Sequence, residues 1–246
     1  MSKCLEVVGL SKIFKGNIVA VDNISFFVNE KEIFGLLGPN GSGKTTTQRM
    51  LAMVLQPTAG KIKYGGRIVD TNLEKYKNRY RIGYIPQGDC LYKDLTVYEN
   101  LDFFSRPYKL DSELRKKNIE LLLTRLKLQD KRDTLVKNLS GGLAKRVSIA
   151  IALIHEPDIL FLDEITMGLD PNSRYEIWNL LKDLKKTTSI IMTTHYMDEA
   201  ETLCDRIAIM SKGKIVELDS PQNILKNHGQ RDLNDVLAEI IKEENE

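Results

Sequence analysis

The 246-residue sequence predicts an α/β fold in which helices cover both faces of a mainly parallel sheet. Three observations lead to this class. Residues up to about 29 hold short β-rich runs separated by turn residues, which indicates an N-terminal antiparallel β subdomain. Apolar strands then alternate with helical segments over residues 33–55 and again over residues 159–211. The pattern between these stretches, over residues 96–157, is helical, and we expect it to form a subdomain inserted into the sheet.

The first alternating stretch begins with a buried strand. Residues 33–37 form a compact apolar run, which is typical of a strand with both faces covered. A glycine-rich loop follows directly, and the helical pattern after it runs from residue 45 to residue 55. Residues 61–69 predict a hairpin, and residues 82–86 predict another short strand.

The inserted segment begins with a helix signal. Thr96 and Glu99 have the spacing of a capping box, and residues 114–128 carry apolar side chains at helical spacing. The chain then returns to the sheet, because three further apolar runs between residues 159 and 211 predict strands separated by helices. The last residues, 232–246, predict a charged terminal helix.

Charge and cysteine usage exclude several classes of protein. With 36 Lys and Arg against 34 Asp and Glu, the chain has no general polyanion-binding character, so we expect no nucleic-acid partner. Cys4, Cys90 and Cys204 lie far apart without metal-ligand spacing and predict reduced thiols of a cytosolic protein. No stretch approaches the roughly 20 apolar residues that span a bilayer. The N-terminus also lacks the layout of a signal peptide. We therefore expect a soluble, cytoplasmic chain that takes any membrane role from a partner.

The glycine-rich loop carries the strongest functional signal, because it satisfies G-x-x-x-x-G-K-[ST] in full. The motif consists of Gly38, Pro39, Asn40, Gly41, Ser42, Gly43, Lys44 and Thr45. Its glycines allow backbone N–H groups to point at phosphate oxygens, and the helix after it presents its positive end to the same anion. Lys44 is expected to neutralise the β- and γ-phosphates of ATP, and Thr45 to bind Mg²⁺ through its hydroxyl. Thr46 is expected to contribute to nucleotide binding.

A chance match to this motif arises in roughly 1% of chains of this length. The position between a predicted strand and a predicted helix disfavours that alternative.

Two carboxylates follow the apolar run of residues 159–162. Asp163 is expected to hold Mg²⁺, and Glu164 to polarise the attacking water as a general base. An acidic pair after a strand is otherwise a helix cap or part of a solvated loop. The phosphate loop in the same chain favours the catalytic interpretation.

A further run distinguishes this chain from other phosphate-loop ATPases. Residues 139–143, Leu-Ser-Gly-Gly-Leu, are close to the LSGGQ signature, so the sequence resembles the nucleotide-binding domain of an ATP-binding cassette (ABC) transporter over almost its whole length. The resemblance implies that Ser140, Gly141 and Gly142 bind the γ-phosphate held by a second subunit. Taken alone, the same residues would suit an ordinary helix N-cap.

Other positions resemble family motifs one by one. Gln87 resembles the glutamine that reaches the metal and the attacking water, and Asp170 resembles the D-loop aspartate that crosses to the partner subunit. His195 resembles the switch histidine near the γ-phosphate, although a lone histidine at a strand end is otherwise often just exposed. Phe14 stands where the family places an aromatic ring on adenine, and a core phenylalanine is the alternative.

The resemblance implies a P-loop NTPase fold of the RecA-like type, with one cassette domain over residues 1–246. Residues 1–88 and 158–231 are expected to form the ATP-binding core with its β subdomain. Residues 89–157 are expected to form the inserted helical subdomain, and residues 232–246 a C-terminal helix.

Two positions depart from the family pattern. Leu143 replaces the glutamine of the signature, and Ile165 replaces the proline common after the catalytic glutamate. Neither change removes a charge that hydrolysis requires, so we expect an active ATPase.

The implied function is ATP-driven transport by a dimer of such subunits, a homodimer in the simplest case, on the cytoplasmic face of a separate membrane permease. The motifs around His195 and Asp170 look similar to those of drug, lipid or polysaccharide exporters, which favours export. Leu91 and Tyr92, apolar and aromatic in an apparent loop after Gln87, predict a docking surface for the permease.

A small-molecule kinase would have no use for the signature. The other alternative is a cassette ATPase of nucleic-acid maintenance or translation. The former carry a long insertion that this chain lacks, and the latter usually carry two cassettes. The transported substrate is not encoded in these residues.

Overall fold

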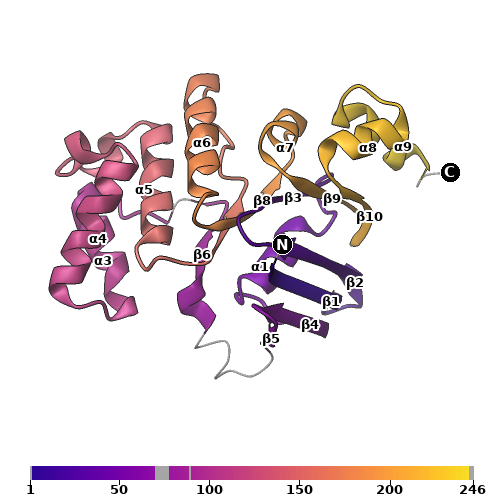
Figure 1. Ribbon diagram of the computed structural model, residues 1–246, viewed down its shortest axis with the longest axis horizontal. Coiled ribbons are helices and arrows are strands. Elements are labelled where there is room, and N and C mark those ends of the chain that lie inside the picture. Colours follow the sequence, from indigo (N-terminus) through magenta and orange to yellow (C-terminus); the bar gives the residue numbers. More distant parts are fainter. Residues whose placement is uncertain (1, 70–77, 89, 244–246) are drawn as a thin grey trace.

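The structure is a computed structural model that describes residues 2–69, 78–88 and 90–243. Its strands form two sheets (Figure 1). Sheet A has the order β2-β1-β4-β5 and consists of Ile18–Asn29, Lys3–Phe14, Ala59–Tyr64 and Arg67–Ile68. Sheet B has the order β10-β9-β3-β8-β7-β6 and consists of Lys214–Asp219, Arg206–Ser211, Ile33–Leu37, Ser189–Thr194, Ile159–Asp163 and Ile82–Ile85.

Sheet A is antiparallel, which confirms the prediction for the N-terminal region. Instead of several short runs, the region forms one long hairpin of two 12-residue strands, β1 and β2. Gly16 and Asn17 turn the chain at its tip with positive φ angles of 81° and 59°. The predicted hairpin at residues 61–69 is present as β4 and β5.

Sheet B is parallel except for β10, which confirms the prediction of a mainly parallel sheet. The four strands β3, β8, β7 and β6 run in one direction, so their carboxyl ends meet at one edge. In open α/β sheets this edge is where ligands bind. The loops after these strands carry Gly38, His195, Glu164 and Gln87 respectively.

The helices occupy three places around the sheets (Figure 1). Helix α1 spans Lys44–Leu51 and lies against the core between the two sheets, to which its Met50 and Leu51 belong. At one end of the molecule lie α3, α4 and α5, which span Val97–Ser105, Ser112–Arg125 and Gly141–Leu153. Over sheet B and toward the other end lie α6, α7, α8 and α9, which span Pro171–Leu184, Met197–Leu203, Pro221–His228 and Leu233–Glu243. In the described part of the chain, short 3-10 turns η1 to η4 span Arg79–Arg81, Arg106–Tyr108, Gln129–Lys131 and Val136–Asn138.

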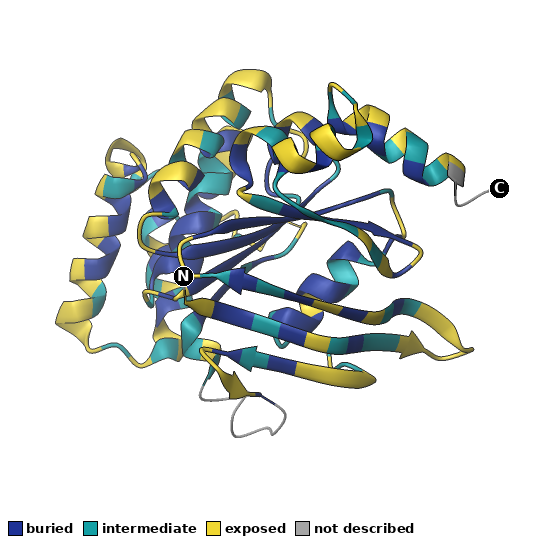
Figure 2. Cartoon of the chain, turned by 45° about the vertical axis from the view of Figure 1, so that its right-hand side comes forward, coloured by how far each residue is buried: buried dark blue, intermediate teal, exposed yellow. Residues whose placement is uncertain are grey.

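Sheet B is buried between two cores (Figure 2). Side chains alternate across a strand, so Ile33 and Leu37 of β3 face the core that includes α5, α6 and α7, whereas Phe34 and Leu36 face sheet A. The Phe34 ring stacks on Phe26 of β2 at a centroid distance of 5.2 Å. Burial of both faces explains why residues 33–37 form an uninterrupted apolar run in the sequence.

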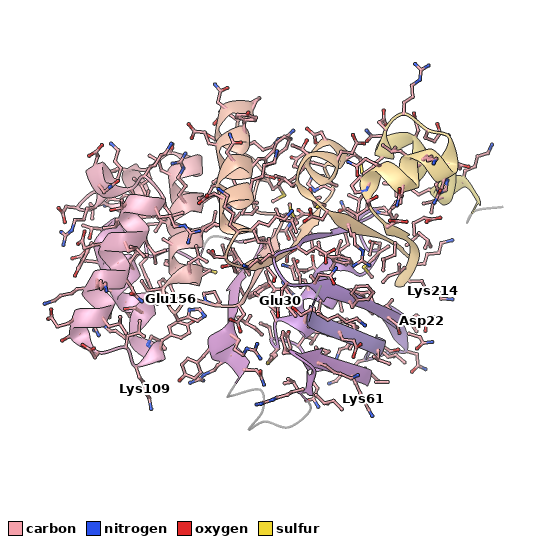
Figure 3. All side chains as sticks on the ribbon, in the orientation of Figure 1. Asp22, Glu30, Lys61, Lys109, Glu156 and Lys214 are labelled. Carbon is pink, nitrogen blue, oxygen red and sulfur yellow. The ribbon has the colours of Figure 1, made fainter. Side chains whose placement is uncertain are left out.

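The two sheets are also joined at their edges. The ammonium of Lys214 in β10 lies 3.4 Å from the carboxylate of Asp22 in β2, and both side chains are visible at one side of the molecule (Figure 3). Both are largely exposed, so this ion pair contributes at most about 1 kcal/mol. The apolar contact between the sheets therefore dominates.

Several element boundaries differ from the sequence predictions. Helix α1 ends at Leu51 instead of residue 55, and Met53 just after it has a positive φ of 60°. Helix α5 starts at Gly141, with Ser140 as its N-cap. The capping box at Thr96 and Glu99 is confirmed, with both of its hydrogen bonds present.

The C-terminal region adds elements that the sequence did not predict, namely strand β10 and helix α8. Helix α9 falls in the predicted terminal helix, and it is docked, because Leu233, Val236 and Ile240 are buried. Residues 244–246 of that prediction lie outside the described residues. In the described part of the chain, no helix has the length and apolar character needed to cross a membrane.

Candidate active site

The phosphate loop depends on glycines at two close approaches. Gly38 has a φ of 143°, and a Cβ there would overlap the carbonyl oxygen of Met210. Gly43 has a φ of 103°, and a Cβ there would lie 2.5 Å from the carbonyl oxygen of Ala20. A side chain at either position would therefore both strain the backbone and displace a neighbouring strand or loop. This accounts for both of the glycines that the motif requires.

Lys44 is placed at the start of α1 inside this loop. Its side chain is buried, and its ammonium donates to the carbonyl oxygens of Gly38 at 2.7 Å and Pro39 at 3.0 Å. Burial lowers the pKa of Lys44, and the carboxylates of Glu164 and Asp163 offset part of that effect. The N-cap residue of α1, Gly43, offers no side-chain acceptor to the first N–H groups of the helix. A cation and open helix N–H groups at one point suit a phosphate.

Asp163 ends β7 with a fully buried carboxylate. Its Oδ1 accepts hydrogen bonds from the hydroxyls of Thr193 at 2.6 Å and Thr45 at 3.2 Å. Its Oδ2 has no hydrogen-bond partner among the described residues. A buried carboxylate oxygen without a donor is costly unless a cation faces it.

These oxygen atoms suit Mg²⁺, which prefers hard oxygen ligands and takes only one or two carboxylates when phosphates and waters complete its shell. Within residues 2–69, 78–88 and 90–243, no group of three or more His, Cys, Asp or Glu side chains is placed to hold a metal ion. The single carboxylate of Asp163 with the Thr45 hydroxyl therefore fits a nucleotide-bound Mg²⁺ and not a metal held by protein alone.

Glu164 is held by two neighbours on different loops. Its Oε2 accepts a hydrogen bond from Nε2 of Gln87 at 2.8 Å, and its Oε1 lies 3.2 Å from Nδ1 of His195. The second contact requires a proton on His195 Nδ1. The backbone of Glu164 has a positive φ of 49°, and its N–H donates to the carbonyl and hydroxyl oxygens of Thr193. The carboxylate is thereby aimed along the edge of the sheet where the phosphate loop lies.

A cavity of about 380 Å³ joins these groups. It is lined by Gly38, Pro39, Asn40, Gln87, Glu164, Met167, His195, Met197 and Leu237. The fold therefore gathers part of the phosphate loop, Glu164, Gln87 and His195 around one cavity, from four separate stretches of sequence.

The remaining candidate residues lie outside this cavity. Phe14 stands at the end of β1 with 41% of its surface exposed, and the ammonium of Lys12 lies 5.2 Å from its ring centroid. Ser140 is the N-cap of α5 and accepts a hydrogen bond from the N–H of Leu143 at 3.4 Å. Asp170 is the N-cap of α6, and hydrogen bonds from Ser173 lower the pKa of its carboxyl.

The signature glycines pack against the segment that leads into α6. A Cβ on Gly141 would lie 3.3 Å from Leu169, and a Cβ on Gly142 would lie 2.8 Å from the Ser173 hydroxyl. Ser140 and Gly141 themselves are exposed. The N-cap role of Ser140 is thus real, and its hydroxyl is also accessible to another molecule.

Sequence reasoning missed four residues of the site. Thr193 bonds both Asp163 and Glu164, and Met167, Met197 and Leu237 line the cavity. For Thr193 the available signal was its hydroxyl near the end of β8, the strand beside β7, which ends at Asp163. No local sequence pattern predicts that Leu237 lines the cavity, because it lies on α9 near the end of the sequence.

The chain also matches known proteins. The family described as ABC transporter matches residues 21–167. The Nod factor export ATP-binding protein I of Ralstonia nicotianae is 39% identical over 238 residues, which are 96% of this chain and 73% of that protein. The protein of the same name from Rhizobium sp. (strain N33) is 41% identical over 230 residues, which are 93% of this chain and 75% of that protein.

Among solved structures, cbiO1 from Clostridium perfringens, part of the ABC transporter complex cbiONQ, has a TM-score of 0.86 at 29% identity, with 92% of each chain covered. The family match spans more than half of this chain, and two relatives exceed 30% identity over most of their length. Members of the family bind ATP and act with a membrane permease. The chain therefore belongs to the ABC transporter family, in which it is an ATP-binding and ATP-hydrolysing subunit.

Proposed function

We propose that this subunit hydrolyses Mg²⁺-bound ATP at residues 38–46 with Glu164 as general base, and that hydrolysis drives export through a separate permease. The proposal rests on the position of the Glu164 carboxylate, which contacts Gln87 and His195 and lines the same cavity as the phosphate loop. The names of the relatives, which are export ATP-binding proteins, support the direction of transport.

The side chains then have separate tasks. Lys44 leaves the carbonyl oxygens of its own loop and neutralises the β- and γ-phosphates. Glu164 orients a water molecule and takes its proton as the water oxygen attacks the γ-phosphorus and the bond to ADP breaks. His195 and Gln87 hold the carboxylate in place. Mg²⁺, held by Thr45, Asp163 and Gln87, would neutralise the charge on the phosphate oxygens.

We propose that a second copy of the chain completes each site. Ser140 and Gly141 are exposed and, with the buried Gly142, open the N-terminus of α5, whereas Asp170 opens that of α6. These groups lie outside the cavity around Glu164, so the phosphate that suits them belongs to another subunit. An arrangement in which each copy offers both surfaces closes as a two-fold homodimer. Phe14, exposed at the end of β1 in sheet A, is proposed to stack on adenine.

The permease is proposed to dock beside Gln87. A cavity of about 320 Å³ there is lined by Tyr84, Ile85, Pro86, Gly88, Cys90, Leu91, Phe104, Tyr108, Ser148, Ile151 and Ala152. Next to it, Tyr92 is 50% exposed and packs edge-on against Phe103, itself 42% exposed. An exposed aromatic pair at the rim of an apolar hollow suits a helix of a membrane subunit. Asp89, between Gly88 and Cys90 in the sequence, lies outside the described residues.

With the permease docked beside Gln87, a movement at the ATP site can be transmitted to the permease. Residues 89–157 are proposed to move as a subdomain against the core of residues 1–88 and 158–231, because Gln87 ties the junction to Glu164. The subunit would then act at the cytoplasmic face of the membrane, with no nucleic-acid partner. Residues 232–246 are proposed as the C-terminal helix of the same cassette domain.

The test is calorimetric titration of the chain with ATP and Mg²⁺. Lys44→Ala removes the side-chain cation from the phosphate loop and should abolish detectable binding. Lys109→Ala is the matched control, because Lys109 is exposed at the far side of the helical region (Figure 3). Unchanged affinity in Lys44→Ala would remove the basis of the proposed site.

A further inference from the structure

A buried acid that the proposed hydrolysis does not use lies between α6 and α7. Glu199 of α7 is fully buried, and its Oε1 accepts two hydrogen bonds of 2.8 Å. One comes from the hydroxyl of Thr166, which is 1% exposed, and the other from the indole Nε1–H of Trp178 in α6. The second oxygen, Oε2, has no hydrogen-bond partner in the described part of the chain.

The two partners of Glu199 lie in different elements, one in the segment after Glu164 and one in α6. Thr166 lies two residues after Glu164, in the segment that ends at Asp170. Within that segment the N–H of Met167 donates to the carbonyl of Glu164, and the N–H of Leu169 donates to the carbonyl of Thr166. The segment from Glu164 to Asp170 is therefore a tightly turned loop that carries both the proposed base and the N-cap of α6. The Thr166 hydroxyl links this loop to Glu199 of α7.

A second chain of contacts leads from α6 to His195. The guanidinium of Arg174 lies 5.0 Å from the Trp178 ring centroid and 4.8 Å from that of Tyr196. It also forms an ion pair with Asp198. The Tyr196 ring in turn packs on the His195 ring at a centroid distance of 4.2 Å. Arg174 and Trp178 are four residues apart, so they share one face of α6.

Stability alone is a poor explanation for this arrangement. Burying a carboxyl group with one of its oxygens unpartnered costs free energy, and an apolar side chain would fill the same space at lower cost. What Glu199 supplies instead is a fixed geometry, because one oxygen accepts from a loop and a helix at once. Retaining a buried polar group at such a junction is consistent with a positioning role.

We propose that Glu199 is a positioning residue for ATP hydrolysis. Through Thr166 and Trp178 it fixes the segment from Glu164 to Asp170 against α6, so that the base and the partner-facing cap move as one body. This inference rests on the proposed catalytic function of Glu164. It adds that movement of this segment on ATP binding is transmitted to the Trp178 indole.

The chain offers a direct reporter of this movement, because Trp178 is its one tryptophan. The experiment compares wild type, Thr166→Val, Glu199→Gln and the control Thr124→Val. Thr166→Val keeps the side-chain shape and removes the hydroxyl. Glu199→Gln keeps an oxygen that accepts both hydrogen bonds and removes the charge. Thr124 is exposed on α4, where its hydroxyl bonds only the carbonyl of Glu120 among the described residues.

Three quantities are measured on each purified full chain with ATP and Mg²⁺: kcat and KM for phosphate release, the ATP-dependent change in tryptophan emission, and the melting temperature. We expect Thr166→Val to lower kcat by about 10-fold or more with little change in KM, because the base is displaced from its working position. Its emission change should shrink. Glu199→Gln should retain both kcat and the emission change, even if its melting temperature falls, because an amide N–H is then buried unpaired.

Wild-type kcat and a full emission change in Thr166→Val would overturn the positioning role. So would a loss of kcat in Glu199→Gln as large as that in Thr166→Val, because the hydrogen-bond geometry would then not be what matters. Lys44→Ala separates this failure from failure of the proposed ATP site. If Lys44→Ala keeps the ATP-dependent emission change, the phosphate-loop assignment is wrong. If it loses that change while Thr166→Val keeps it, the ATP site stands and the role of Glu199 is wrong.

Discussion

Thr193 faces Asp163 in register across the parallel strands β8 and β7, and its hydroxyl donates a 2.6 Å hydrogen bond to Asp163 Oδ1. Thr45 reaches the same oxygen at 3.2 Å. Two hydroxyls thus fix one oxygen of a buried carboxylate and leave Oδ2 as its free acceptor among the described residues. The carboxylate is therefore oriented before a cation binds.

Thr193→Val should weaken Mg²⁺-dependent ATP binding without destroying the fold. The substitution keeps the β-branched shape but removes the hydroxyl that orients Asp163. Loss of a ligand-orienting group typically lowers metal affinity 10- to 100-fold. Loss of a hydrogen bond to a charged group lowers the free energy of unfolding by about 2 kcal/mol. Titration of Mg²⁺ at fixed ATP measures the first effect and urea unfolding the second, with Thr124→Val as control. Wild-type Mg²⁺ dependence would show that Thr45 alone orients the carboxylate.

Much of this site was accessible from sequence, because the phosphate loop and the pair Asp163-Glu164 each directly follow an apolar strand. Such strands are buried and parallel, so their ends had to meet at one edge. The sequence marks Thr193 only as a hydroxyl at the end of a strand. Its pairing with Asp163 could not be predicted, because the register of two parallel strands is set by tertiary packing.

The errors at element boundaries have similar causes. The predicted helix after the phosphate loop was too long because apolar residues continue to residue 55, although Met53 adopts a left-handed conformation that ends the helix. Strand β10 was not predicted from the sequence. In the structure it follows a tight hairpin turn, in which Lys212 and Gly213 both have positive φ. Docking of α9 depends on contacts with α7 and α8, which no periodicity specifies.

ATP should bring two copies of the chain together. In the Glu164→Gln background, light scattering should give about twice the mass when ATP and Mg²⁺ are added. Adding Ser140→Asp should prevent this, because a carboxylate at the N-terminus of α5 would face the phosphates of the partner. Ser112→Asp is the matched control, since Ser112 lies in the first turn of α4, where an acidic residue is tolerated. Equal masses with and without ATP in the parent would contradict the dimer.

Tyr92→Glu should uncouple the subunit from its permease. A charge on this exposed ring would oppose insertion of an apolar helix into the adjacent cavity. ATP binding by the isolated chain should not change, whereas copurification with the permease and transport should fall together. Val54→Glu, at a position 61% exposed after α1, serves as the control. Full transport by Tyr92→Glu would place the docking surface elsewhere.

His155 should make the fold sensitive to acid. Its ring stacks on Tyr108 at a centroid distance of 3.8 Å, and its Nε2 lies 2.9 Å from the carbonyl oxygen of Ile82. Burial lowers its pKa below the ordinary value of 6.5. The unfolded chain therefore binds a proton more readily than the folded chain. Stability should fall as the pH drops below about 6.5.

Replacing His155 by Phe keeps the stacked ring and removes the titrating group. The decline of the free energy of unfolding between pH 7 and pH 5, followed by urea unfolding, should be shallower in His155→Phe than in wild type. Identical slopes in the two proteins would mean that other groups determine the acid response.

Glu164, held by Gln87 and His195, is proposed as the base that activates water. Glu164→Gln keeps the shape and the hydrogen-bond acceptor but removes the basic carboxylate. Loss of a general base typically lowers the rate by about 10²–10⁴. The decisive measurement is phosphate release under saturating ATP and Mg²⁺, with ATP affinity determined on the same sample. ATP binding should be retained, and turnover should be reduced by that factor. Wild-type turnover in a variant that binds ATP normally would contradict it.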